Sequence, residues 1–244
     1  MPRDTDPITT SVWVRPSRAR RGEQPTLSRE QIVRAAIELL DAEGLSGLSM
    51  RRLGAKLGAG ATSVYWYVAN KDELLELVLD EAMGEIELPD PSAAGWRSAV
   101  SDAVRSVRAV ILRHTWVAGL YGTHPAIGPQ SMRLSDRLIA VLTAAGFSGL
   151  ELAHASSLLM SHALGSAVMD VAMHTATALS GKGVNELVQQ LEPYFDRIAE
   201  EYPSYTKWWS QNKDADLERL REEGFEFGLE RLLDGLESWL RSGD

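Results

Sequence analysis

Residues 27–75 read LSREQIVRAAIELLDAEGLSGLSMRRLGAKLGAGATSVYWYVANKDELL and decide the fold class. The first part predicts an amphipathic helix, because Ser28 is a good N-cap and Gln31, three residues later, completes a capping box. Gly44 supplies a stop signal at the other end. The apolar residues that recur on one face of this helix are Ile32, Ala36, Leu39 and Leu40.

A glycine break then separates two short predicted helices. Ser49 caps the first of them, and Gly58–Gly60 ends it within three residues. In the second, Val64 and Val68 stand four residues apart and form an inward pair. A helix, a tight glycine turn and a short helix make a helix-turn-helix unit. Its small core is expected to contain Leu53, Leu57, Val64 and Val68.

The inward valines fix the directions of the remaining side chains on the second short helix. Thr62, Ser63, Tyr65 and Trp66 must lie on its outer or lateral surface. Such hydroxyls can contact base edges in the major groove, and a tyrosine can donate to a phosphate oxygen.

Flanking cations extend this surface. Asn70 is expected to cap the next helix, with Glu73 in the capping-box position, which places Lys71 at an N-terminus suited to a phosphate. Arg51 and Arg52 begin the preceding helix, where a duplex backbone would pass. Each residue also has an ordinary interpretation: solvated arginines, a first-turn lysine, or Trp66 as a lid over the small core.

The charge distribution favours a polyanionic partner despite a net charge of −9. Residues 1–71 carry 11 Lys and Arg against 7 Asp and Glu, whereas residues 72–244 carry 14 against 27. A positive end on an acidic body orients the approach to DNA. An acidic body can equally serve solubility alone.

The remaining sequence predicts only helices, so the fold class is all-α. Residues 1–26 are expected to be a flexible basic arm, residues 27–72 a three-helix DNA-binding domain, and residues 73–244 a helical ligand-binding and dimerisation domain. Residues 95–120, 129–147, 148–179 and 214–240 have helical apolar patterns. The long pattern at 148–179 is apolar on most faces and is expected to be buried on several sides. Residues 175–187 and 202–215 are expected to be connections.

Several functional classes find no support in the residues. The chain has no cysteine, which excludes disulfides, thiolate metal sites and cysteine nucleophiles and fits a cytoplasmic location. No apolar run approaches the roughly 20 residues that span a bilayer, and no signal peptide is expected. A nucleophile elbow, a phosphate-binding loop and a metal motif are all missing, so an enzyme is not expected.

Residues 27–75 resemble the DNA-binding domain of the TetR family of transcriptional repressors. The resemblance rests on the pattern GL…LSMRRL…LG…SVYWYV.NKDELL, while the rest of the chain is similar to the tetracycline-repressor-type C-terminal domain in its length, helix spacing and YGTHP segment at 121–125. Membership implies a homodimer that binds a palindromic operator and releases it when a small molecule binds. Family membership also suggests an adjacent efflux gene as the regulated target.

Carried over by position, the resemblance assigns base contacts and backbone contacts. It implies that Arg51, Ala61, Thr62 and Ser63 face bases, whereas Tyr65, Trp66 and Lys71 hold the backbone. Gly54 stands where an alanine is usual and should loosen its helix by ~1 kcal/mol. Ala61 is too short to hydrogen-bond a base.

The basic arm has two interpretations. Its arginines, among them Arg18, Arg20 and Arg21, can reach into a minor groove or along phosphates. Relatives from antibiotic-producing actinomycetes often carry a similar extension, which favours this role. The alternative is a disordered solubilising tail.

The effector is expected to be larger than tetracycline and mainly apolar, such as a natural product or a drug. The tetracycline repressor binds its drug's magnesium with a histidine just before the segment that resembles YGTHP, and Leu120 occupies that place here. Neither a metal site nor tetracycline is therefore expected, and no cofactor is expected either. The candidate pocket residues are Trp116, Leu120, His124, Met132, Leu138, His154 and Met160. Each of them can also be simple bundle core.

The helices near 150–178 and 216–240 are expected to form the dimer interface as a four-helix bundle. Small residues on the first of them, Ala163, Gly165, Ser166 and Ala167, would permit close approach. The sequence leaves one alternative open, a DNA-binding activator or architectural protein without a small-molecule ligand. The two alternatives share the DNA-binding domain and differ only in the C-terminal one.

Overall fold

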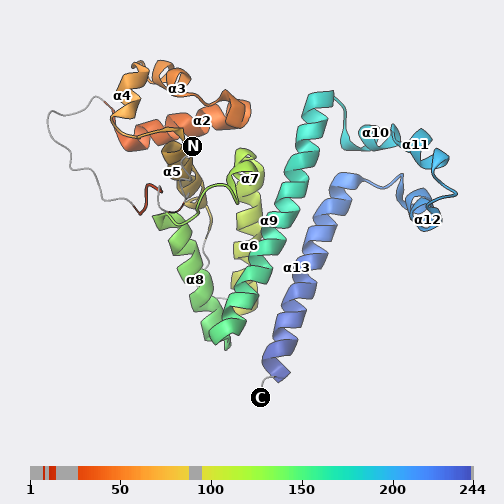
Figure 1. Cartoon of the computed structure of the whole chain (residues 1–244). Coiled ribbons are helices and arrows are strands. Elements are labelled where there is room, and N and C mark those ends of the chain that lie inside the picture. Colours follow the sequence, from red (N-terminus) through yellow and green to blue (C-terminus); the bar gives the residue numbers. More distant parts are fainter. Residues whose placement is uncertain (1–7, 9–10, 15–26, 88–94, 243–244) are drawn as a thin grey trace, which may run out of the picture. The chain divides into compact units, whose positions relative to one another are not determined.

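The computed structural model describes residue 8 and residues 11–14, 27–87 and 95–242 (Figure 1). Among these residues every regular element is a helix, which confirms the predicted all-α class. The helices are α2 (Arg29–Gly47), α3 (Met50–Lys56), α4 (Ala61–Tyr65), α5 (Lys71–Met83), α6 (Gly95–Arg113), α7 (Trp116–Leu120), α8 (Pro129–Ala145), α9 (Gly149–Ser180), α10 (Val184–Gln189), α11 (Glu192–Arg197), α12 (Pro203–Asn212) and α13 (Leu217–Ser242). None of the helices in this described part is long and apolar enough to cross a membrane.

The chain divides into two compact units, Met1–Ser157 and Leu158–Asp244. In the first, α2, α3 and α4 form a small bundle above α5, and α5 in turn contacts α6, α7 and α8 (Figure 1). Helix α5 runs without interruption across the predicted domain boundary at residue 72.

The predicted caps are present at the helix starts of the first unit. Ser28 and Gln31 form the reciprocal capping box of α2, and the Ser49 side chain accepts from Arg52 N at the start of α3. Gly44 has a φ of 66°, which interrupts α2 where the stop was predicted, although the helix resumes up to Gly47. Local sequence signals therefore set these boundaries.

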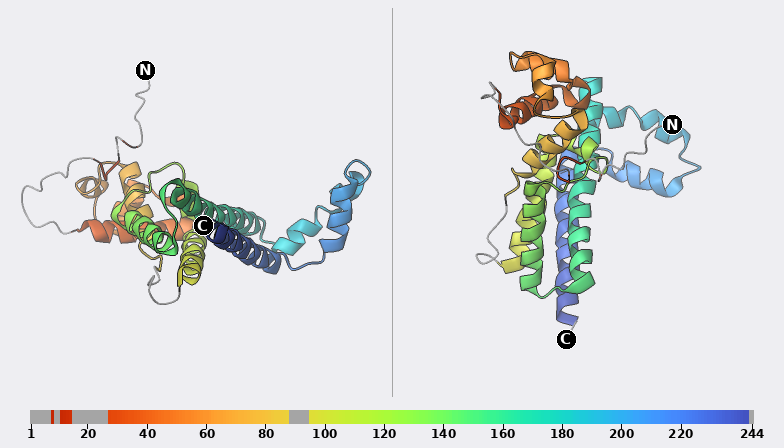
Figure 2. Two further views of the ribbon diagram at one scale, coloured as in Figure 1. Left: turned by 90° about the horizontal axis from the view of Figure 1, so that it is seen from below. Right: turned by 60° about the vertical axis from the view of Figure 1, so that its left-hand side comes forward.

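In the second unit, α9 and α13 run side by side (Figures 1 and 2). The His162 ring lies over Gly228, where an added Cβ would stand 2.5 Å from His162 Cε1, so the glycine permits this approach. His162 Nε2 lies 3.0 Å from the Phe225 carbonyl oxygen, and the imidazole ring of His162 stacks on the phenyl ring of Phe225. Arg221 pairs with the buried Asp170 at 3.1 Å.

Two sequence predictions about these helices were wrong. Residues 175–187 and 202–215 were expected to be connections, but α9 continues to Ser180 and α10 and α12 are helical. Pro203 begins α12 because a proline at the first helical position loses no hydrogen bond there. The pattern at 95–120 is two helices, since α6 ends at Arg113 and α7 begins at Trp116.

Candidate nucleic-acid interface

Helix α4 presents the predicted recognition side chains outward. Val64 and Val68 are at most 1% exposed and anchor the element, as predicted. Thr62 is exposed, and Tyr65 and Trp66 are 48% and 83% exposed. Trp66 is therefore no lid over the core. The remaining predicted base-facing residues of α4, Ala61 and Ser63, are half-buried.

The first turn of α4 is held close to α3 by a glycine. Gly54 is buried, and its carbonyl oxygen accepts from Ala59 N at 2.8 Å. A Cβ at residue 54 would stand 2.9 Å from both Ala59 O and Ala61 N. The glycine expected merely to loosen α3 thus has a packing role, because the turn backbone occupies the space of a side chain.

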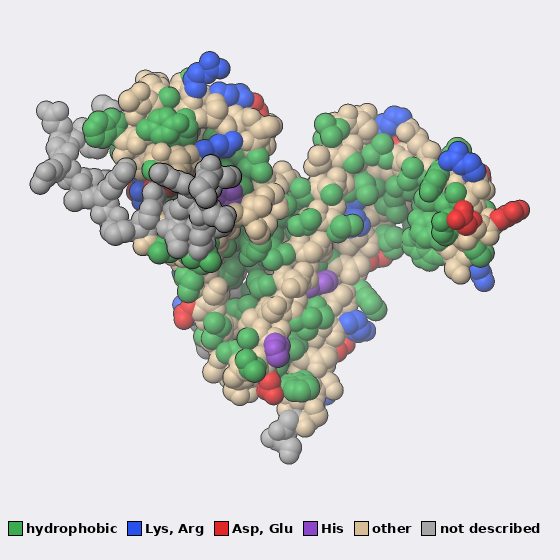
Figure 3. Space-filling model, in the orientation of Figure 1, with side chains coloured by type: hydrophobic (Ala, Val, Ile, Leu, Met, Phe, Trp, Pro, Cys, Tyr) green, Lys and Arg blue, Asp and Glu red, His purple; other side chains and the backbone are tan. Residues whose placement is uncertain are grey.

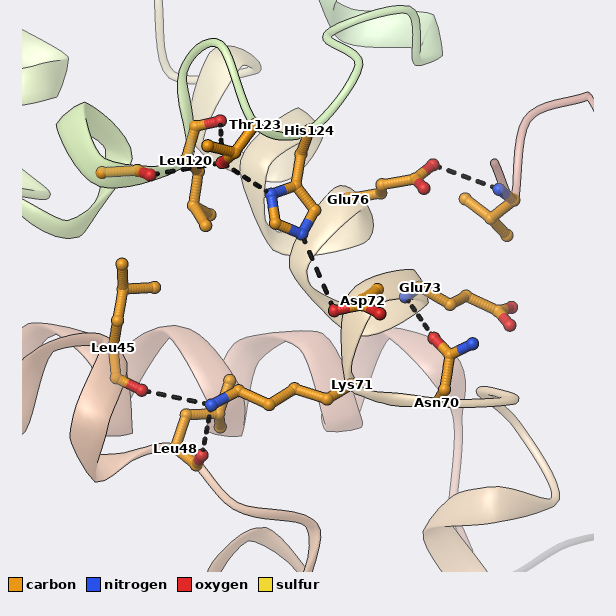
Figure 4. A network of polar contacts seen from close by, with 12 residues as sticks. Leu45, Leu48, Asn70, Lys71, Asp72, Glu73, Glu76, Leu120, Thr123 and His124 are labelled. Carbon is orange, nitrogen blue, oxygen red and sulfur yellow. Dashed lines mark hydrogen bonds and ion pairs between the residues drawn. The ribbon is translucent and has the colours of Figure 1, made fainter. Parts of the chain in front are cut away.

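The backbone that follows α4 is held by hydrogen bonds to α2 and α5. Tyr67 O accepts from the Arg29 guanidinium at 3.4 Å. Asn70 Oδ1 accepts from Glu73 N at 2.7 Å, and the Glu73 carboxylate accepts from Ala69 N at 2.7 Å (Figure 4). Asn70 and Glu73 form the predicted capping pair. The Glu73 carboxylate accepts from Ala69 N, however, and not from the backbone N–H of the cap residue Asn70.

Lys71 joins the start of α5 to the end of α2. Its Nζ donates to Leu48 O at 2.8 Å and to Leu45 O at 3.2 Å (Figure 4). A lysine at a helix C-terminus satisfies carbonyls that lack intrahelical partners. An ammonium has three N–H donors, and these two bonds use two of those of the half-buried Lys71.

The two arginines of α3 have different surroundings. Arg52 forms hydrogen bonds with the Glu43 carboxylate and donates to Gly47 O at 3.1 Å, which ties α3 to the end of α2. Arg51 is exposed. Lys and Arg side chains are visible on the surface of this part of the molecule in Figure 3. Of the two, Arg51 is thus the one whose charge is directed to solvent.

The predicted arginines of the arm, Arg18, Arg20 and Arg21, lie outside the described residues. Residues 11–14 of the same predicted arm are described and pack against α5. Ser11 is fully buried and donates to Glu76 at 2.5 Å.

Two of the candidate pocket residues lie in the buried core around α7. Trp116 and Leu120 are 3% and 2% exposed, and α7 contacts α2, α5 and α6. Leu138, also buried, lines a groove between α6 and α8. The groove is otherwise lined by Ala99, Val100, Ala103, Leu134, Arg137 and Val141.

The other candidates lie elsewhere. His124 is half-buried, with Nδ1 3.1 Å from Thr123 Oγ1 and Nε2 4.0 Å from the Asp72 carboxylate (Figure 4). Met132 and His154 are exposed on α8 and α9, and Met160 is half-buried in the second unit. Of the seven candidate pocket residues, only Leu138 therefore lines the groove between α6 and α8.

A polar network that the sequence reasoning missed joins α7 to α2, with His114 and Trp116 buried and its carboxylates exposed. Asp41 Oδ1 lies 2.7 Å from both His114 Nδ1 and Trp116 Nε1. His114 Nε2 lies 3.1 Å from Glu85, whose other oxygen accepts from Arg113 at 2.6 Å. No periodicity signals this cluster, because its residues come from separated segments.

Partial burial opposes the charge of Glu85, but hydrogen bonds from Arg113 and His114 outweigh it and lower the pKa of this carboxyl. The residues the structure describes include no group of three or more His, Cys, Asp or Glu side chains that could hold a metal. The network is therefore an ion-pair and hydrogen-bond cluster.

An outward hydroxyl-bearing helix fixed behind a glycine turn, followed by a large helical region, defines a helix-turn-helix DNA-binding protein. Residues 32–78 match the family of bacterial regulatory proteins of the tetR type, and residues 88–240 match the tetracyclin repressor-like C-terminal domain. The chain belongs to the TetR family of transcriptional regulators. It is a DNA-binding transcriptional regulator and not an enzyme.

Similar proteins come from actinomycetes. An HTH-type transcriptional regulator of Saccharopolyspora erythraea is 35% identical over 86% of this chain and 89% of that relative. The HTH-type transcriptional repressor DrrR1 of Streptomyces coeruleorubidus is 33% identical over 93% and 83%. The crystal structure of the Streptomyces coelicolor TetR family protein ActR in complex with actinorhodin has a TM-score of 0.71 and 32% identity, over 86% of this chain and 98% of that one.

Proposed function

We propose that this protein is a homodimeric cytoplasmic repressor that binds a palindromic operator through α4 and releases it when a mainly apolar small molecule binds. The observation that carries the proposal is the fixed outward presentation of Thr62 and Tyr65, with the half-buried Ser63 between them, on a helix anchored by Val64. Because α4 is clamped at both of its ends, its side chains are pre-organised for a groove. Arg51 and Lys71 add charge beside it.

Dimerisation is supported by apolar side chains that the second unit leaves uncovered. On α9, Val168 and Met169 are 42% and 70% exposed, and on α13 Phe227 is 65% exposed. The expectation that this region of α9 is buried on several sides is therefore not met by the single chain. Of the small residues expected to permit close approach, Ala163 and Ala167 are already buried within the chain, while Gly165 is exposed. A second copy would cover these faces in a four-helix bundle.

A mainly apolar effector is supported by the apolar character of Trp116, Leu120 and Leu138. The structure of ActR in complex with actinorhodin makes actinorhodin a first probe to test. Under the proposal, effector binding favours a dimer whose α4 helices no longer match successive major grooves. The regulated gene is proposed to encode an efflux function.

The test is selection of bound duplexes from a random library, followed by fluorescence anisotropy with the selected sequence. We expect a palindrome with half-sites about 34–36 Å apart and a Kd of about 10⁻⁸ to 10⁻¹¹ M. Thr62→Ala and Ser63→Ala should weaken binding to this sequence but not to unrelated DNA. Equal loss on both DNAs would contradict base contacts by these residues.

A second arm tests release. Actinorhodin and a panel of mainly apolar natural products are added to the complex, and both anisotropy and the thermal unfolding temperature of the protein are measured. A compound that raises the unfolding temperature and dissociates the complex supports the proposal. Compounds that bind without dissociating DNA would support an activator or architectural protein.

A further inference from the structure

Residues 11–14 form a small turn that packs on α5. Ser11 is fully buried, whereas Val12 and Trp13 are half-buried. The turn is closed by Val14 N, which donates to Ser11 O at 3.2 Å, and by Trp13 N, which donates to Ser11 Oγ at 3.3 Å. This part of the chain is therefore a defined structural element.

The attachment point is the carboxylate of Glu76. Its Oε2 accepts from Ser11 Oγ at 2.5 Å and from Val12 N at 3.1 Å (Figure 4 shows Glu76 and the backbone contact). Glu76 is only 5% exposed and stands among the buried residues of α5. A carboxylate removed from water requires hydrogen-bond donors, and the turn supplies two of them.

Glu76 lies midway along a helix that is attached at both ends. At the N-terminal end, Lys71 holds the carbonyls that end α2. At the other end, the buried Asp80 carboxylate accepts from Gln130 N at 3.1 Å and from Ser131 N at 2.9 Å, which caps α8. The contacts of Glu76 with the turn lie between these two attachment points.

We propose that residues 11–14 act as a strap that fixes α5, and that Ser11 and Glu76 are positioning residues for operator binding. The inference rests on the proposed function, because it assigns the N-terminal segment a role in the DNA-binding state. The strap acts through α5 and not through phosphates. This separates it from the arginine-rich part of the predicted arm, whose contacts would be electrostatic.

The experiment compares Ser11→Ala and Glu76→Gln with the matched control Glu81→Gln, an exposed glutamate on the same helix. Amide hydrogen exchange is measured along α5 in each full-length protein. Operator affinity is then measured between about 50 and 200 mM salt, because binding that depends on phosphate contacts falls steeply over this range. A triple substitution of Arg18, Arg20 and Arg21 by alanine serves as the electrostatic comparison.

We expect faster exchange along α5 in Ser11→Ala, which loses one hydrogen bond, and in Glu76→Gln, which keeps an acceptor oxygen but loses the charge that strengthens both bonds. Operator binding should be about fivefold weaker at every salt concentration in Ser11→Ala, as for one lost hydrogen bond. The slope of affinity against salt should stay that of the wild type, because no phosphate contact is lost. Unchanged exchange along α5 in Ser11→Ala would overturn the strap. Faster exchange with operator affinity equal to that of Glu81→Gln would overturn the positioning role.

The two proposals fail in distinguishable ways. If the wild-type protein selects no DNA sequence, the proposed function fails, while hydrogen exchange still decides whether the strap fixes α5. If Glu76→Gln does not fold, Ser11→Ala and a deletion of residues 1–14 are compared with Glu81→Gln in the same two measurements. A flattened salt slope in Ser11→Ala would assign the segment to phosphate contact and contradict the strap.

Discussion

Trp116 Nε1 donates a hydrogen bond of 2.7 Å to Asp41 Oδ1. This bond links α7, which carries two candidate pocket residues, to α2 of the DNA-binding domain. The same oxygen lies 2.7 Å from His114 Nδ1, and Gly119 on α7 approaches Leu45 so closely that an added Cβ would stand 2.9 Å from its Cδ1. Helix α7 is therefore in direct polar and apolar contact with α2.

Removing the indole N–H should weaken this contact. Trp116→Phe keeps an aromatic ring but removes the N–H and the second ring of the indole, so it leaves Asp41 without one donor and opens a small cavity, at a cost of at least about 1 kcal/mol. The expected loss in unfolding temperature is about 2–4 °C, measured by calorimetry. Trp208→Phe, at a residue 50% exposed on α12, is the control and should change little. Equal unfolding temperatures for the two variants would show that the bond contributes no stability.

Gly54→Ala should have two opposing effects on stability, a gain from helix propensity and a loss from packing. Alanine is favoured over glycine in a helix by about 1 kcal/mol, but its Cβ would stand 2.9 Å from backbone atoms of the turn before α4. Because backbone cannot yield as a flexible side chain can, we expect a net loss of stability and a displaced α4. Urea unfolding should show this loss, whereas Gly224→Ala, with open space at its Cβ, should be neutral or stabilising. A stabilised Gly54→Ala protein would contradict the packing role.

Much of the fold follows from the sequence because its signals are local. Ser28, Ser49 and Asn70 cap the helices that they were expected to cap, and Val64 with Val68 sets the outward face of α4. These features depend on hydrogen bonds and periodicities within a few residues.

The rest depends on contacts between distant segments. The role of Gly54 depends on the later turn that packs on it, and Lys71 meets carbonyls more than twenty residues earlier in the chain. Asp41 and Trp116, 75 residues apart, give no joint pattern. The candidate pocket residues were named by resemblance, and the structure places Met132 and His154 at the surface. Side chains that meet only in the folded state leave no signal at their own positions.

Glu85 should make stability sensitive to acid. Its pKa is lowered from the ordinary 4.5, so its contribution to stability is present above that value and is lost as the pH falls through the lowered pKa of the folded state. Glu85→Gln should remove this part of the dependence and flatten the acid limb of the unfolding free energy. Urea unfolding of both proteins from pH 7 to about pH 3 measures the difference. Parallel curves would mean that Glu85 ionises alike in the folded and unfolded chains.

Substitutions of Tyr65 and Lys71 should separate phosphate contact from base contact. Tyr65→Ala and Lys71→Ala are expected to weaken binding to all sequences about equally and to reduce the dependence on salt, most strongly for the charged Lys71. Lys71→Ala should also lower stability, since Leu45 O and Leu48 O lose their partner. Anisotropy titrations with operator and unrelated DNA test this. A loss confined to the operator would contradict the backbone role.

The central claim is that α4 reads a two-fold symmetric DNA site in a dimer that an apolar effector releases. Hydroxyl-radical footprinting of the selected duplex tests it most directly, with and without a compound shown to bind the protein. We expect two protected patches about one helical turn apart in the compound's absence and loss of both when it is added. A single patch, or protection that persists with the compound bound, would contradict it.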